Sequence, residues 1–327
     1  MHSPTLPPVP GISHSPAVPI TLRKPTVAEH LYKYKERYLL LLPAIVLFIV
    51  FRYVPMAGIV LAWKRFNVTG GLFGSPWAGW RYFEQLFEAP DFLRVLRNTV
   101  FINGVLRMGI AFPMPILFAL LLNEMRVLGV KRVVQSISYL PHFLSWVVVA
   151  SLIRPLLASS GPANLLAGTM GFDTPILFLQ QPTWFLVIIT LSDIWKGIGW
   201  GSIIYLAAIS GIDPTLYESA DMDGAGRLQK MRYITLPSIA FIIVVMFLLQ
   251  LGNVLELGFD QIFNLYNPLV YNVGDIIGTY VYRIGILDFR YSFATAVGLF
   301  QNVVGLAALV GANWFIKRLG AGAYTVV

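Results

Sequence analysis

The sequence predicts an all-α membrane protein that crosses the bilayer six times. Of its 327 residues, 57% are hydrophobic and only 12% are charged, whereas about 25% of the residues in a soluble domain are charged. The mean hydropathy is +0.69. Apolar stretches of about 20 residues, each long enough to cross a bilayer, occur six times. A soluble protein of this length could not bury so much apolar surface, but a bilayer can cover it.

The two ends of the chain predict cytoplasmic segments outside the membrane. Residues 1–25 are rich in proline and serine and contain no apolar run, which is typical of a disordered tail. In residues 26–38, Thr26 and Glu29 have capping-box spacing, and aromatic and basic side chains alternate after them. This pattern predicts a short amphipathic helix on the inner membrane surface. Residues 319–327 are expected to form a cytoplasmic tail.

The predicted transmembrane domain, residues 39–318, holds six spans near 39–62, 98–122, 132–154, 183–208, 236–257 and 293–316. Prolines lie inside or beside several spans, and bundled membrane helices tolerate them because neighbouring groups satisfy the freed carbonyls. Lysine and arginine are moderately enriched in the tails and in segments 123–131 and 209–235. This bias predicts a multi-pass inner-membrane protein with both termini in the cytoplasm.

Several classes of function are disfavoured by the composition. The net charge of +8 is spread over the ends of apolar segments, so it predicts topology rather than nucleic-acid binding. Cysteine is absent, which excludes thiolate chemistry. The four histidines lack metal-ligand spacing, and we expect His142 to be packed and hydrogen-bonded. We found no phosphate-binding G-x-x-x-x-G-K-[ST] loop and no Ser–His–Asp arrangement. The chain is therefore predicted to be non-catalytic, with no metal or cofactor of its own.

One polar segment interrupts the apolar sequence between spans four and five: YESADMDGAGRLQKMRYITLP, residues 217–237. Asp213 and Pro214 predict a helix start, because aspartate accepts hydrogen bonds at an N-cap and proline fits the first position. Gly224 predicts the left-handed end of that helix. A second helix is expected from about Ala225 to Tyr233, and Pro237 is expected to open span five. The segment could also be only a solvated connector.

The same segment resembles the EAA motif of ABC importer permeases, E-A-A-x3-G-x9-I-x-L-P. The match comprises Glu218-Ser219-Ala220, Gly224 and Ile234-x-Leu236-Pro237, and serine replaces the usual first alanine. In that family the segment forms a coupling helix that docks into a groove on the ATP-binding subunit. The resemblance therefore assigns the coupling role to Glu218, Ser219, Ala220, Asp221, Asp223, Gly224 and Ala225.

Other stretches extend the resemblance over most of the chain. Residues 96–99, LRNT, resemble the usual start of span two in sugar permeases, and residues from Ser136 and from Tyr38 resemble oligosaccharide permeases. The chain most resembles the first permease subunit of bacterial alginate importers. This implies the six-helix type I importer fold and an oligosaccharide substrate, including acidic ones such as alginate. The implied partners are a second, different permease, two ATP-binding subunits that hold ATP and magnesium, and a periplasmic binding protein.

Polar side chains within the predicted spans are candidates for the substrate path, because such groups are costly in a membrane. The candidates are Asp193, Trp195, Lys196, Trp200, Gln250, Asn253, Gln301 and Asn302. The spacing of Asp193 and Lys196 predicts an ion pair on one helix face. In the alternative interpretation, Trp195 and Trp200 stack on sugar rings and Lys196 meets a carboxylate. The amides could hydrogen-bond sugar hydroxyls or equally join helices. Arg107 is expected to snorkel or pair near a span end. Asp275 is expected on an outer loop, facing the binding protein.

Rival functions remain open from the residues alone. A proton-coupled secondary transporter would need a buried carboxylate relay, for which Asp193 and Glu256 are candidates, although internal repeats are not evident. A membrane-embedded polysaccharide-processing enzyme would need a catalytic acid or a metal cluster. A structural scaffold is disfavoured by the motif at residues 217–237.

Overall fold

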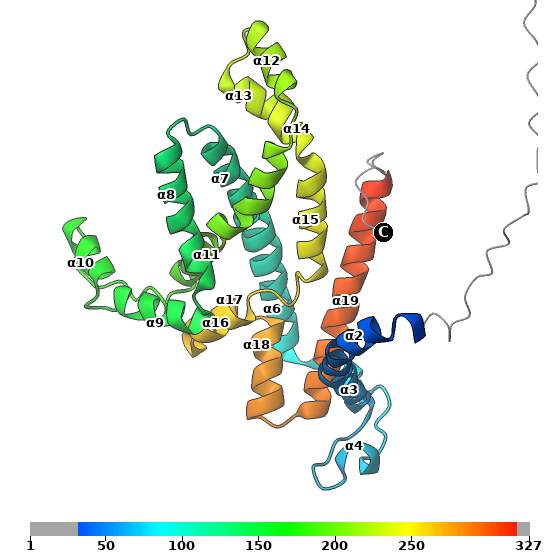
Figure 1. Ribbon diagram of the computed structural model, residues 1–327. Coiled ribbons are helices and arrows are strands. Elements are labelled where there is room, and N and C mark those ends of the chain that lie inside the picture. The colour runs from blue at the N-terminus through cyan, green and yellow to red at the C-terminus, as the bar shows by residue number, and fades with distance from the viewer. Residues whose placement is uncertain (1–31, 319–327) are drawn as a thin grey trace, which may run out of the picture. The chain divides into compact units, whose positions relative to one another are not determined.

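The computed structural model describes residues 32–318, and within this range the regular elements are all helical (Figure 1). The only β-type pairing among them is an isolated bridge between Lys64 and Trp77. The chain divides into two compact units, up to Ala57 and from Gly58 onwards. The predicted tails, 1–25 and 319–327, and most of the predicted surface helix, 26–38, lie outside the described residues.

The first unit is a run of helix that supplies most of the first predicted span. It contains α2 (Lys35–Phe48), the π-helical η1 (Ile49–Tyr53) and α3 (Val54–Met56), and the 3-10 helix η2 (Ala57–Trp63) follows. The stretch Lys35–Trp63 is long and apolar enough to cross a membrane. Pro43 lies inside α2 without ending it. None of the residues of α2 is buried, as expected of a helix whose surroundings are lipid or other subunits.

The second unit begins with two short helices, α4 (Gly71–Gly74) and α5 (Arg81–Glu88), before its first long helix. That helix combines α6 (Pro90–Thr99), the π-helical η3 (Val100–Ala111) and α7 (Pro113–Asn123). Two further long helices are α11 (Pro182–Ser210) and α19 (Tyr291–Arg318). All three pass the length and hydropathy criteria for a membrane span. They correspond to predicted spans two, four and six.

Helix α11 packs closely against two other helices because it has glycines at the points of contact. A Cβ atom at Gly199 would lie 2.1 Å from the carbonyl oxygen of Ser138, and one at Gly201 would lie 3.0 Å from the Pro115 ring. These glycines therefore set how near α11 can come to α8 (Leu128–Tyr139) and to α7. Close approach through small residues is the usual way that helices associate within membranes.

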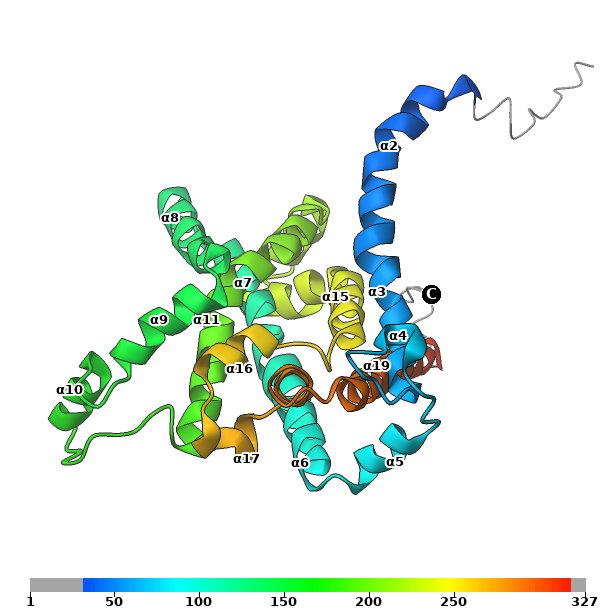
Figure 2. The ribbon, with the colours of Figure 1, turned by 90° about the horizontal axis from the view of Figure 1, so that it is seen from below.

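The predicted third span, 132–154, is a bent pair of helices rather than one straight helix. Helix α8 continues into the 3-10 turn η4 (Leu140–Phe143), and α9 (Trp146–Leu156) then starts at an angle of 102°. Pro141 lacks a backbone N–H and cannot continue the α8 ladder. Leu144 and Ser145 are extended, and the Ser145 hydroxyl accepts from the Val148 N–H at 3.3 Å, which caps a new helix. Helix α10 (Pro162–Thr169) follows α9, and the pair extends to one side in Figure 2.

The predicted fifth span, 236–257, is also broken. The second half of the polar loop forms α13 (Arg227–Lys230) and the π-helical η5 (Met231–Thr235), and α14 (Leu236–Ser238) follows directly. Ile239 leaves the helical conformation, and α15 (Ala240–Gly252) begins after a bend of 60°. Pro237 is the cause, since its ring and missing N–H interrupt the ladder. Helix α15 ends at Gly252, so the expected end at residue 257 was too late.

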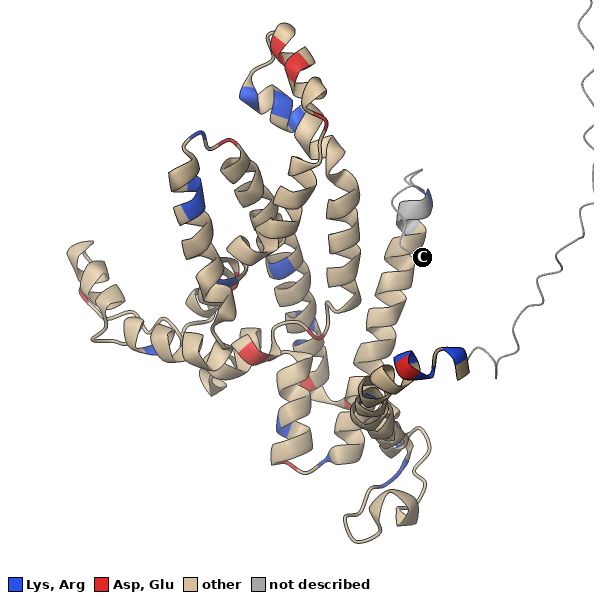
Figure 3. Cartoon of the chain, viewed as in Figure 1, with Lys and Arg blue, Asp and Glu red and all other residues tan. Residues whose placement is uncertain are grey.

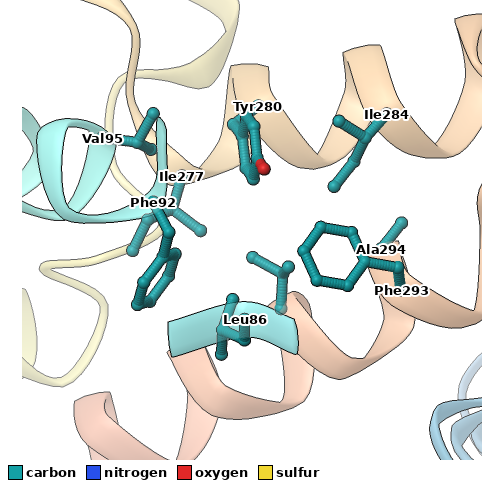
Figure 4. Close-up of a cluster of buried hydrophobic side chains, with 9 residues drawn as sticks. Leu86, Phe92, Val95, Ile277, Tyr280, Ile284, Phe293 and Ala294 are labelled. Carbon is teal, nitrogen blue, oxygen red and sulfur yellow. The ribbon is translucent and has the colours of Figure 1, made fainter. Parts of the chain in front are cut away.

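The chain then returns to α19 through short helices at the end of the unit opposite the polar loop (Figure 1). These elements are α16 (Phe259–Leu265), η6 (Pro268–Val270), α17 (Tyr271–Gly274), α18 (Ile277–Tyr282) and η7 (Arg283–Leu287). Of these, α18 and η7 pack with α5, α6 and α19 around a cluster of buried apolar side chains (Figure 4). Within it, Phe92 packs edge to face on Phe300, with ring centroids 5.4 Å apart. This geometry is favourable for aromatic pairs.

Candidate functional site

The polar segment of residues 213–237, which we call the coupling loop after the role that its resemblance to the EAA motif implies, contains the predicted caps. Helix α12 (Pro214–Met222) has Asp213 as its N-cap, whose carboxylate accepts from the Thr215 N–H at 2.9 Å. This bond holds the pKa of Asp213 below its usual range. At the other end Gly224 is left-handed, with φ of 75°. The Ala225 N–H donates to the Ala220 carbonyl, which completes a Schellman motif.

The two arms of the coupling loop are fastened to each other. Lys230 of α13 forms an ion pair with Asp221 of α12. The hydroxyls of Tyr217 and Thr235 are 2.9 Å apart and hydrogen-bonded. Helix α13 starts at Arg227, two residues later than predicted. Because an ion pair ties α12 to α13 and a hydrogen bond ties it to η5, we expect the loop to move as one body.

The outward surface of the coupling loop combines charge with apolar side chains. Glu218 and Ser219 are exposed, and the Ser219 hydroxyl donates to the Thr215 carbonyl at 2.9 Å, so its own helix satisfies it. Met222 is 90% exposed and Leu228 is 78% exposed. Acidic residues lie on α12 and basic residues on α13 at this end of the second unit (Figure 3). Exposed apolar side chains beside charges are typical of a protein–protein contact.

The remaining predicted coupling residues lie within or beside α12. Asp221 and Asp223 are exposed, and Asp221 is engaged by Lys230. Ala220 and Ala225 are half-buried where the helix ends. The structure therefore brings all seven residues into one short segment at the tip of the unit.

A buried network joins three helices in the middle of the second unit. Arg107 of η3 donates to the Asp193 carboxylate of α11 at 3.1 Å and to the side-chain oxygen of Gln261 on α16. Gln261 in turn donates to the Ser192 hydroxyl at 2.8 Å and to the Ile189 carbonyl at 2.6 Å. We call Arg107, Asp193, Gln261 and Ser192 the mid-span network. The expectation that Arg107 lies near a span end is wrong, because the residue is in the middle of Pro90–Asn123 and is 9% exposed.

Gly258 explains how the arginine fits. This glycine has φ of 88° and precedes α16. A Cβ atom here would lie 2.7 Å from a guanidinium nitrogen of Arg107. Only glycine combines the left-handed backbone with room for the arginine. Sequence analysis missed Gln261 and Gly258, because nothing in the local pattern indicates a partner some 150 residues earlier in the chain.

The predicted ion pair between Asp193 and Lys196 is replaced by other contacts. Asp193 pairs with Arg107, and the Lys196 ammonium donates to the His142 carbonyl at 2.7 Å. The two charges still interact at longer range, but the close contact of each side chain is with another element. Asp193 also lines a cavity of about 210 Å³, together with Gln250 of α15.

Lys196 belongs to an aromatic cluster at the break between α8 and α9. Its ammonium lies over the Trp146 ring, 5.6 Å from the centroid. The His142 ring is stacked on Trp200 at 4.7 Å with an interplanar angle of 4°. Phe143 contacts the same indole edge to face at 5.5 Å. The prediction that His142 is packed holds for its stacked ring, but its neighbours were not foreseen.

The other predicted path residues are not gathered at this cluster. Trp195 is 47% exposed. Gln301 of α19 is buried and donates to the Leu255 carbonyl at 2.7 Å, so it fastens the unwound chain after α15. Asn253 donates to the Leu249 carbonyl of its own helix at 3.2 Å. Asn302 is exposed beside a separate pocket between α18 and α19.

Asp275 does not face outwards as expected. It is fully buried, and Arg283 grips its carboxylate through two nitrogens at 3.2 and 2.6 Å. Thr279 also donates to it at 2.9 Å. Burial acts to lower the pKa of Arg283, but the hydrogen bonds and charge of Asp275 outweigh it and raise that pKa. The aspartate therefore holds α18 and η7 together rather than meeting a partner.

The four histidines have no metal-ligand spacing, and the described residues contain no group of three potential metal ligands.

Comparison with known proteins gives close relatives. Residues 101–320 match the family described as binding-protein-dependent transport system inner membrane component. The chain is 45% identical to the polygalacturonan/rhamnogalacturonan transport system permease protein YteP of Bacillus subtilis (strain 168) over 291 residues, which cover 89% of this chain and 90% of YteP. It is 43% identical to Protein LplB of the same organism over 285 residues, which cover 87% of this chain and 89% of LplB.

Two crystal structures are similar to the chain over most of its length. One is a bacterial ABC transporter involved in the import of the acidic polysaccharide alginate, with a TM-score of 0.82 and 42% identity, covering 89% of this chain and 98% of that chain. The other is a bacterial alginate ABC transporter in complex with an alginate pentasaccharide-bound periplasmic protein. Its TM-score is also 0.82, with 41% identity, and the match covers 90% of this chain and 98% of that chain.

Proposed function

Since this chain belongs to the family of binding-protein-dependent transport system inner membrane components, we propose that it forms half of the pathway of an ATP-driven importer of acidic oligosaccharides. The predicted family and its helical permease fold are confirmed by the family match and by the similar alginate transporter. The chain is thus a multi-pass permease of the inner membrane, and the secondary-transporter alternative is set aside. Its substrate and its subunit contacts are the proposed parts.

The proposed substrate is a short chain of uronic acids. YteP is named for polygalacturonan and rhamnogalacturonan, and the similar structure transports alginate. These polymers share carboxylated pyranose rings. Import of an oligogalacturonate and of an alginate oligomer into vesicles, with a neutral oligosaccharide of equal length as control, tests the assignment. Preferential uptake of the neutral sugar would contradict it.

The proposed assembly contains a second, different permease, two ATP-binding subunits and a periplasmic binding protein. The similar transporter bound to a periplasmic protein supports the last of these. In this proposal ATP and magnesium are held by the ATP-binding subunits, and this chain has no catalytic role. The coupling loop faces the cytoplasm, and both termini lie on the same side. Closure of the ATP-binding pair moves the loop and opens the path alternately to the two sides of the membrane.

The single observation that carries the coupling role is the outward face of α12. Glu218 is exposed there beside Met222, on a loop that the Lys230–Asp221 and Tyr217–Thr235 contacts make rigid. A rigid projecting element can transmit the motion of a partner that grips it. A carboxylate at its surface can pair with a base on that partner.

Glu218→Lys tests this role by reversing the charge without touching the loop's internal contacts. We expect normal insertion of the protein but a loss of about tenfold or more in ATPase stimulation by loaded binding protein, because the docked charge would become repulsive. Both ATP hydrolysis and uptake should be measured in proteoliposomes.

Glu124→Lys is the matched control, since Glu124 lies in the turn after α7, outside the coupling loop. We expect this variant to keep its stimulation. Normal stimulation and uptake in Glu218→Lys would overturn the coupling role, whatever the substrate proves to be.

A further inference from the structure

We propose that Lys196, Trp200 and the turn at His142–Phe143 form a binding subsite for one carboxylated sugar ring of the transported chain. This inference rests on the proposed function and deepens it. In this subsite Lys196 binds the carboxylate of the substrate. The aromatic rings at Trp200, His142 and Phe143 contact the C–H face of the sugar.

The position of Lys196 is the first argument. It lies near the midpoint of α11, a 29-residue helix long and apolar enough to span the membrane. A charged ammonium at that depth is too costly to face lipid, so such groups meet a water-filled path or a partner charge. The side chain is half-buried rather than enclosed. The face of α11 that carries Lys196 is therefore turned away from the acyl chains.

The contacts of Lys196 are the second argument. An ammonium has three donors, and one hydrogen bond is present for it among the described residues, the bond to the His142 carbonyl. The break after η4 makes this carbonyl available, because in a continuous helix it would accept from the Trp146 N–H. The remaining donors are available to a ligand. Asp193, three residues earlier on α11, acts on Lys196 through its charge, but its direct ion pair is with Arg107.

The rings around Lys196 are the third argument. Trp200 is 45% exposed and Phe143 is 69% exposed, although they lie on the apolar part of the chain. His142 stacks flat on Trp200 and holds the indole in one orientation. A pyranose ring presents a face of C–H groups that packs on such an aromatic surface. A cation beside fixed rings therefore fits a carboxylated sugar better than a neutral one, since the carboxylate gains a charge-assisted hydrogen bond.

The test uses the complete importer in proteoliposomes with saturating, oligogalacturonate-loaded binding protein. Lys196→Met removes the charge but keeps an apolar chain, and we expect uptake to fall about tenfold, the loss expected for one charge-assisted hydrogen bond. Lys196→Arg keeps the charge and should retain most of the uptake. Lys131→Met is the matched control, because Lys131 lies in the first turn of α8, away from the cluster, and it should transport normally.

A second measurement detects the ligand directly. With Phe143 replaced by photoreactive p-benzoylphenylalanine, illumination during turnover should attach labelled oligogalacturonate to this chain. Unlabelled oligogalacturonate should compete and a neutral oligosaccharide should not. The capture should be lost when Lys196→Met is added. A purely structural role for Lys196 would not produce this pattern.

Each failure has a distinct meaning. Normal uptake by Lys196→Met, or no capture from position 143 while the wild type imports oligogalacturonate, overturns the subsite and leaves the proposed function standing. Loss of the second permease from purified Lys196→Met would show that the lysine pairs with that subunit, which also overturns the subsite. If the wild type imports no acidic oligosaccharide, the substrate proposal and the subsite fall together.

Discussion

The coupling loop and the mid-span network are both polar, but they are held together by contacts of different range. In the loop, Asp213 bonds to Thr215, and Lys230 pairs with Asp221 nine residues away. In the network, Arg107 reaches Asp193 and Gln261, 86 and 154 residues away. The loop's structure is therefore largely local, whereas the network exists only when three helices have packed. Substitutions should distinguish the two regions accordingly.

Arg107→Met should have the largest effect on stability. It leaves the Asp193 carboxylate and Gln261 without their partner in a low-dielectric interior, which costs about 3 kcal/mol or more in free energy of unfolding. The thermal unfolding midpoint of the purified importer measures this loss. Arg126→Met is the control, since Arg126 is exposed beyond the end of α7, and it should leave the midpoint unchanged. An unchanged midpoint in Arg107→Met would mean that the network does not hold the helices.

Alanine at the two left-handed glycines compares the regions directly. Both Gly258 and Gly224 have positive φ, so alanine costs about 1–2 kcal/mol of backbone strain at each. At Gly258 the new Cβ would also displace the Arg107 guanidinium, whereas at Gly224 it meets no atom within 4 Å. Gly258→Ala should therefore lower the unfolding midpoint more than Gly224→Ala does. Equal shifts would show that the close contact with Arg107 is not required.

The helix cap at Asp213 should give the smallest effect, confined to the loop. The folded-state pKa of Asp213 lies below its ordinary value of 3.8. The bond to Thr215 therefore contributes its full stability above that pH and loses it as the pH falls through the lower, folded value. Asp213→Ala should increase hydrogen exchange at the start of α12 at neutral pH, whereas Asp213→Asn, which can also cap, should not. Equal exchange in both variants would exclude the cap.

The contrast in range also explains how much could be predicted from the sequence. Asp213 and Gly224 predict the two ends of α12 because capping depends on residues only a few positions apart. Four spans are single helices near their predicted places. Pro141 and Pro237 are visible in the sequence, but a proline in a membrane span can either be tolerated or break the helix. The sequence alone does not distinguish these outcomes. The breaks at these residues are decided by tertiary packing as much as by proline.

The candidate path residues were predictable in type but not in grouping. Lys196 and Trp200 were found because polar and aromatic residues are conspicuous in a span. Their contacts with His142 depend on the 102° turn between α8 and α9, which a linear pattern does not contain. Asp193 was assigned to Lys196 by helical spacing, and the stronger arginine partner came from another helix. Gln261 lies on α16, beyond the predicted end of span five, so a search for polar side chains within spans did not reach it.

Cross-linking from the coupling loop is the most direct test of the account, and the absence of cysteine from the chain makes it clean. Ser219→Cys provides a single exposed thiol on α12 for a maleimide–benzophenone reagent in the intact importer. The account predicts an adduct with the ATP-binding subunit, and none from Ser159→Cys, between α9 and α10. No adduct from position 219, or an equal one from position 159, would contradict the claim that the ATP-binding subunit docks on this loop.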